Sequence, residues 1–203
     1  MEPLKERNMT YLPTLRITAV DLDHSGRYIG DGKVSDWPGH IEIDADLGTV
    51  CFTGSVVAAG NIVALAGSGV EAAGSIKAGR SINADTDIKA GADIEAVLGI
   101  IMAGSGIEAG RGTTAGSYIV SGGGIMTGLG IEAVRSIFAG LGIKAKWISC
   151  GEEIHAGLSA PRRATPKDKQ IRAEIRNGTV ARGEHVPPVK PSAACRASQT
   201  TGI

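Results

Sequence analysis

The chain has 203 residues, which is enough for one domain with short appendages. Apolar residues make up 42% of it and aromatic residues only 3%, so Ile, Val and Ala must supply the core, while 30 glycines argue against a helical bundle because glycine weakens helix interiors. The net charge is zero, but residues 1–160 hold 12 basic and 18 acidic residues and residues 161–203 hold nine basic and three acidic, a balance that disfavours a uniformly basic nucleic-acid binder.

Residues 1–55 are predicted to form a small β cap over the first end of the fold. TLRITAV and HIEIDADLGTVCF alternate like strands, with a turn at 46–48. Acidic side chains gather here, and they are either a surface for a basic partner or ordinary solvated positions. The candidates for partner binding are Asp21, Asp23, Asp31 and Asp36. No basic-then-apolar leader and no long apolar run is present, so we expect a soluble, cytoplasmic protein without a membrane partner.

Residues 56–158 carry an aliphatic residue at every sixth position, followed two places later by a small residue. Ile76, Ile82, Ile88 and Ile94 are the clearest examples. A helix cannot use this spacing, because its faces repeat every 3.6 residues. In a strand, positions i and i+2 share one face, and a glycine after them permits a sharp bend. The pattern therefore predicts an all-β fold, a parallel β-helix with three faces and about six coils.

A coil of about 18 residues can be tested on the outward charges, because residues one coil apart should stack. With one inserted residue between Ile100 and Ile107, two rows contain no adjacent like charges. The first row is Glu71, Lys89, Glu108, Met126 and Lys144, and the second is Lys77, Glu95, Thr114 and Glu132.

The third outward row is predicted to be Asn83, Ile101, Val120 and Phe138, an exposed apolar ridge. Such a surface is either an interface or is covered by a terminal segment of the same chain. Tyr118 and Trp147 fall on corners near this row, and aromatic residues are enriched in interface cores. We therefore add both residues to the predicted partner-binding set.

Residues 159–203 are predicted to hold a linker, a β-hairpin and a disordered basic tail. Asn177-Gly178 between two alternating runs is a typical hairpin turn, and residues 187–203 have no periodicity.

The sequence predicts no catalytic, cofactor-binding or metal site. Cys150 occupies an inward small-residue position and His155 an outward one, so a Cys–His pair is disfavoured. The G-x-G-x-x-A matches are followed by another hexad rather than a helix, which argues against dinucleotide binding. A hexapeptide-type acyltransferase is also disfavoured, because the order of small and aliphatic residues differs and no loop interrupts residues 66–158.

The repeats GSIKAG, ADIEA, GSGIEAG and LGIKAK, over about residues 70–158, resemble the "GSIxAGG" repeat proteins of bacteriophages and mobile elements, often labelled polymer-forming. The stretches Cys150-Gly-Glu and 178–184 are similar to the end of those proteins. Bactofilins, which are cytoskeletal β-helix polymers, are similar to this chain more weakly. The resemblance implies a phage-like origin and a β-helix, and it implies no particular activity.

Three hypotheses follow. The first is a non-catalytic protein-binding solenoid, with a host defence complex as partner and the chain as its inhibitor. The second is a self-assembling structural β-helix, which is a bactofilin-like polymer or a virion component and would form a homo-oligomer. The third is an acyltransferase, the least favoured of the three.

Overall fold

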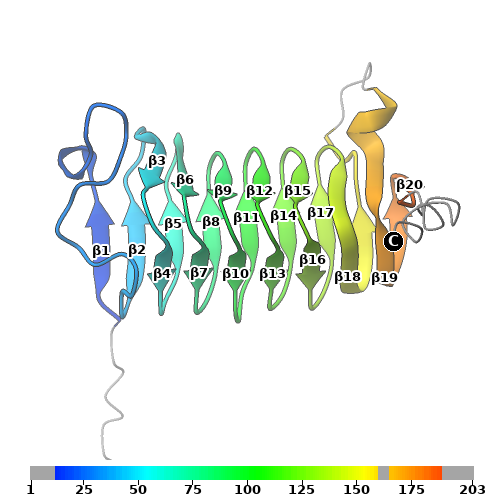
Figure 1. Ribbon diagram of the computed structural model, residues 1–203, viewed down its shortest axis with the longest axis horizontal. Coiled ribbons are helices and arrows are strands. Elements are labelled where there is room, and N and C mark those ends of the chain that lie inside the picture. Colours follow the sequence, from blue (N-terminus) through cyan, green and yellow to red (C-terminus); the bar gives the residue numbers. More distant parts are fainter. Residues whose placement is uncertain (1–11, 160–164, 189–203) are drawn as a thin grey trace, which may run out of the picture.

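The computed structural model describes residues 12–159 and 165–188, and it shows a parallel β-helix of about six coils (Figure 1). The pairings between its named strands are parallel, and each strand pairs with the strand one coil earlier and one coil later. The predicted fold class is therefore confirmed.

Short strands form three faces. The first face holds β3 (Gly48–Phe52), β6 (Ser68–Ala72), β9 (Ile88–Ala90), β12 (Ile107–Ala109) and β15 (Ile125–Thr127). The second holds β4 (Val56–Ala58), β7 (Ile76–Ala78), β10 (Ile94–Ala96), β13 (Thr113–Ala115) and β16 (Gly130–Ala133). The third holds β1 (Thr14–Ile17), β2 (His40–Ile43), β5 (Ile62–Ala64), β8 (Ile82–Ala84), β11 (Ile101–Ala103), β14 (Ile119–Ser121) and β17 (Ile137–Ala139).

Two long strands, β18 (Ile143–His155) and β19 (Gln170–Arg182), continue around all three faces, and β20 (Glu184–Val186) returns to the first. Two short 3-10 helices, η1 (Ala19–Asp21) and η2 (Pro166–Lys169), lie outside the coil. Among the residues described, no helix is long and apolar enough to cross a membrane.

The core is the column of inward Ile and Ala side chains that the hexad spacing predicts. Ile76, Ile82 and Ile88 are fully buried, and the alanines two places on are nearly so. Burying one such isoleucine contributes about 1.5–3 kcal/mol relative to exposure. The interior is filled by these side chains, so the functional surface has to lie on the outward positions and corners.

The coil step is 20 residues between β3 and β6, 18 between β6 and β9, and 18 again after one step of 19 in the middle of the rod. Ile107 pairs with Ile125 at a step of 18, whereas Ile82 pairs with Ile101 at a step of 19. The extra residue lies in the corner 97–100, which has four residues where the equivalent corners 79–81 and 116–118 have three. The sequence had placed this insertion later, between Ile100 and Ile107.

The first coils do not form a separate domain that ends at residue 55. β2 pairs with β5 and β3 with β6, both in parallel, so the solenoid continues through this boundary. Capping comes from the segment 18–39. Its backbone bonds to the outer edge of β3 through Tyr28, and to the outer edge of β4 through Val34 and Trp37. The predicted cap is thus a loop laid on the first coil.

The predicted C-terminal hairpin is wrong. Asn177 and Gly178 lie inside β19, which pairs in parallel with β18 along its length. Gly178 has a φ of +99° and forms the corner between the second and third faces. An Asn-Gly pair suits a hairpin turn, but here the open edge of β18 offers a parallel partner to the aliphatic residues on both sides of the turn. The predicted disordered tail lies mostly outside the described residues.

Candidate functional site

The outward side chains form three rows along the rod, and both predicted charged rows are confirmed by the strand pairing. Lys77 and Glu95 form an ion pair of 3.0 Å across adjacent coils. The row on the third face is Val63, Asn83, Met102, Val120, Phe138 and His155.

One member of the predicted apolar ridge is wrong. Ile101 is fully buried, and Met102 takes the outward position between Asn83 and Val120. The cause is the position of the inserted residue. Ile100 and Ile101 are both aliphatic, so the hexad spacing alone cannot decide which of them continues the core.

The apolar surface is wider than the predicted ridge, because the adjoining corner between the second and third faces is also apolar. We call the whole surface the apolar face. It consists of Val97, Leu98, Ile100, Met102, Tyr118, Val120, Val134 and Phe138. Leu98 is 74% exposed, Val134 65% and Met102 42%. Isolated exposed apolar residues are common, but several of them on neighbouring coils favour an interface.

Aromatic rings give the apolar face a defined shape at its C-terminal side. The ring of Phe138 stacks on His155 at 4.9 Å between centroids and lies 6.2 Å from that of Tyr118. The guanidinium of Arg135 lies 5.0 Å from the centroid of the Tyr118 ring, and its Nε is 3.2 Å from a carboxylate oxygen of Glu152. The face therefore has an aromatic end bordered by one cation and one anion.

The remaining predicted aromatic, Trp147, lies elsewhere. It sits at the corner between the first and second faces, where its ring occupies the space above the Cα of Gly130. The guanidinium of Arg176 lies 4.5 Å from the centroid of this ring. The structure thus accounts for Trp147 by contacts within the chain, and it does not join the apolar face.

Two of the four acidic candidates, Asp21 and Asp23, are bound in local turns. Asp21 accepts hydrogen bonds from the backbone N–H and the hydroxyl of Thr18. Asp23 accepts from the N–H groups of Ser25 and Arg27, which hold its pKa below the ordinary value. Both carboxylates are therefore used in local turns.

The two remaining acidic candidates, Asp31 and Asp36, are exposed. A carboxylate oxygen of Asp36 lies 3.8 Å from the ammonium of Lys33. Local bonding and pairing thus account for three of the four acidic candidates.

The corners follow a hydrogen-bonding rule that explains their composition. The last corner residue before a strand donates its N–H to the side chain at the same position one coil earlier. Ser75 donates to Ser55, and Asp93 donates to Ser75. Ser81 donates to the Asn61 side chain, and Ile100 in turn to Ser81. Polar corner residues therefore join the coils, since an unpaired buried N–H is costly.

This rule is broken at the apolar face. Ile100 and Tyr118 occupy the position held by Asn61 and Ser81 in earlier coils, and their side chains replace the polar acceptors. Within the described residues, the N–H groups of Tyr118 and Ser136 have no hydrogen-bond acceptor.

Sequence reasoning missed Val97, Leu98, Ile100 and Val134 as surface residues. The available signal was Val97 and Val134 at the first corner position, where Gly79 and Gly116 stand in neighbouring coils, because the hexad pattern treats the corners only as connections.

Cys150 and His155 do not form a reactive pair. The Cys150 side chain is buried on the second face, and burial raises the pKa of its thiol. His155 is on the third face, where it stacks on Phe138 and lies 2.9 Å from a carboxylate oxygen of Glu153.

No protein-family model, curated protein or solved structure matches this chain.

Proposed function

We propose that this chain is a non-catalytic protein-binding rod, which docks on a protein partner through the apolar face. The observation that carries the proposal is the exposure of Leu98, Met102 and Val134 on neighbouring coils that also carry Tyr118 and Phe138. A rigid surface loses little conformational entropy on binding, which favours affinity.

The chemistry of the face suits a protein partner. Aromatic residues and methionine are enriched in interface cores, and charged residues usually lie on the rim. Here Tyr118 and Phe138 are the anchors, while Arg135 and Glu152 border them. The guanidinium of Arg135 can donate to acceptors on the partner. The partner surface should therefore be apolar, with carbonyl or carboxylate groups at its edge.

The resemblance of the repeats to phage and mobile-element proteins supports a host protein complex as the partner, with this chain as its inhibitor. A non-catalytic rod would act by occupying a surface on its target.

Self-assembly is the second candidate, and one observation favours it. Along residues 174–182 the outer edge of β19 has no strand partner among the described residues. An open edge can pair with another chain. However, an end-to-end polymer needs two open ends, and the segment 18–39 already bonds to the outer edges of β3 and β4.

The test compares two methionines in equivalent outward positions. Met102 lies on the apolar face and is 42% exposed, while Met126 lies on the first face and is 45% exposed. The full chain, the double variant Met102→Lys/Val120→Lys and the control Met126→Lys are each immobilised and used to capture proteins from a host lysate. We expect the double variant to lose the captured partner by at least about tenfold, which corresponds to about 1.4 kcal/mol, while Met126→Lys retains it.

Equal capture by both variants, with unchanged circular dichroism, would overturn the proposal. Light scattering after size-exclusion chromatography measures the size of the particles and so tests self-assembly. Long polymers of the full chain would support self-assembly and contradict the inhibitor hypothesis.

A further inference from the structure

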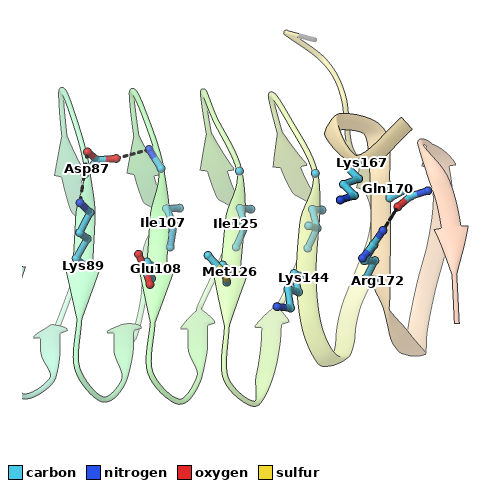
Figure 2. Close-up of a pocket in the computed structure, with 14 residues that line it drawn as sticks. Asp87, Lys89, Ile107, Glu108, Ile125, Met126, Lys144, Lys167, Gln170 and Arg172 are labelled. Atoms are coloured by element: carbon cyan, nitrogen blue, oxygen red, sulfur yellow. Dashed lines mark hydrogen bonds and ion pairs between the residues drawn. The ribbon is translucent and has the colours of Figure 1, made fainter. Parts of the chain in front are cut away.

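A hollow of about 410 Å³ lies on the first face, next to η2 (Figure 2). Its floor is formed by three glycines, Gly106, Gly124 and Gly142, which precede the inward isoleucines of three successive coils. Figure 2 shows Glu108, Met126, Lys144 and Arg172 on adjacent strands along the hollow, with Lys167 and Gln170 at its C-terminal end. The volume falls in the range of small-molecule sites, about 300–1,000 Å³.

The hollow exists because one corner position lacks side chains over three coils. Asp87 occupies this position in the coil before, and Gln170 in the coil after. The chain leaves the coil after Gly157 and returns through η2, whose backbone passes close to Gly142. The hollow is therefore closed by Asp87 at one end and by η2 at the other.

The glycine floor also leaves two peptide N–H groups unused. Asp87 accepts a hydrogen bond of 2.8 Å from the N–H of Gly106, as the corner rule requires. Gly106 and Gly124 have no side chain that could accept a hydrogen bond from the N–H at the same position one coil later. Within the described residues, the N–H groups of Gly124 and Gly142 accordingly have no acceptor. These two donors lie one coil apart, or about 4.8 Å.

Cations gather at the C-terminal end of the hollow. Lys144, Lys167 and Arg172 line it there, and the Gln170 side-chain oxygen holds the Arg172 guanidinium through bonds of 2.9 and 2.7 Å. The acidic groups, Asp87 and Glu108, lie toward the other end, where Lys89 is 4.0 Å from Asp87. The C-terminal half of the hollow therefore favours an anion.

We propose that this hollow binds a ligand carboxylate, which accepts hydrogen bonds from the N–H groups of Gly124 and Gly142 beside Lys144, Lys167 and Arg172. The ligand would supply the group that the Asp87 side chain supplies one coil earlier. Charge-assisted bonds of this kind are about twice as strong as neutral ones. Met126 and the glycine backbone offer an apolar surface for the hydrocarbon part of the ligand.

The test uses the amide NMR signals of the full chain during titration with sodium succinate. We expect saturable shifts of the Gly124 and Gly142 signals, with little change on the apolar face. Sodium chloride at equal ionic strength is the control for a general charge effect, and sodium phosphate is the control for another oxyanion. A titration with a short Gly-Asp-Gly peptide, amidated at its C-terminus, tests whether the carboxylate can also come from a protein side chain.

Two variants remove the site in independent ways. In Gly124→Ser, the added Cβ would lie 3.2 Å from the carbonyl oxygen of Gly142, so a serine fits with a small shift. Its hydroxyl would accept the Gly142 N–H, as Ser55 accepts the N–H of Ser75 at 3.0 Å. Lys144→Gln removes one cation and leaves the floor intact. We expect both variants to bind succinate at least about tenfold more weakly.

Lys146→Gln is the matched control, because Lys146 is also exposed on β18 but does not line the hollow. The proposal fails if chloride shifts the two glycine signals as much as succinate does, or if phosphate binds more tightly. It also fails if Gly124→Ser and Lys144→Gln bind as the control does. Binding by succinate or by the peptide supports the site and identifies the source of the carboxylate. None of these outcomes depends on the apolar face, which lies on a different side of the coil.

Discussion

The carboxylate of Asp87 accepts the peptide N–H of Gly106 at 2.8 Å, across a step of 19 residues. This bond belongs to a series that joins successive coils outside the strand ladders, up to the coil of Gly106 and Gly112. Asp93 bonds to the N–H of Gly112 in the same way at 3.0 Å. The corner side chains therefore stabilise the stacking, in addition to the buried Ile and Ala.

The first prediction concerns Asp87. Asp87→Ala leaves the N–H of Gly106 without its acceptor, and we expect the free energy of unfolding to fall by about 1–3 kcal/mol. Asp87→Asn keeps an acceptor oxygen at the same place and should recover most of the loss. Urea denaturation of the three proteins measures the difference. Equal stability of the alanine and asparagine variants would show that the bond contributes nothing.

The second prediction concerns the close approach of corner backbones. A Cβ on Gly110 would clash with the carbonyl oxygen of Gly91 in the coil before, which is backbone and cannot rotate away. We expect Gly110→Ala to lower the free energy of unfolding by about 1–3 kcal/mol. Gly54 is the matched control, since nothing lies within 4 Å of an added Cβ there. Gly54→Ala should leave the thermal midpoint unchanged or slightly higher.

The third prediction tests the register at the inserted residue. Ile101 is fully buried and Met102 is 42% exposed. Ile101→Ala should therefore cost about 2–5 kcal/mol of unfolding free energy, because it opens a cavity in the core. Met102→Ala should change stability by less than about 0.5 kcal/mol. The opposite order in urea denaturation would place the inserted residue after Ile100, where the sequence alone had put it.

Most of the fold could be predicted from the sequence because one physical constraint repeats. A narrow interior accepts only a large and a small apolar residue from each strand, so Ile76 and Ala78, and their equivalents, mark the faces directly. The two charged rows were predicted from the same hexad spacing. Local turn chemistry was less informative, because Asn177-Gly178 favours a hairpin locally but the adjacent β18 edge determines the pairing.

The candidate site was predicted only in part. Val120 and Phe138 were placed correctly on the third face, since they follow Ile119 and Ile137 in the regular frame. Met102 was missed because Ile100 and Ile101 are both aliphatic, and the hexad spacing does not show which of them points inward. The hollow on the first face depends on which coils lack a corner side chain and on where η2 returns, and neither is visible without the strand pairing.

The last prediction concerns acid. Hydrogen bonds from the backbone N–H groups of Arg27 and Ser25 lower the pKa of Asp23 from its ordinary value of 3.8. Because the pKa is lower in the folded state, the ionised carboxylate stabilises the fold above about pH 4, and this stabilisation is lost as the pH falls through the folded-state pKa. Asp23→Asn should therefore lower the thermal midpoint at about pH 6, and the difference from the parent should shrink toward about pH 3. Asp31→Asn is the control, because Asp31 is exposed and accepts no side-chain hydrogen bond within the described part of the chain. A difference between Asp23→Asn and the parent that stays constant over this range would show that the turn does not depend on the charge of Asp23.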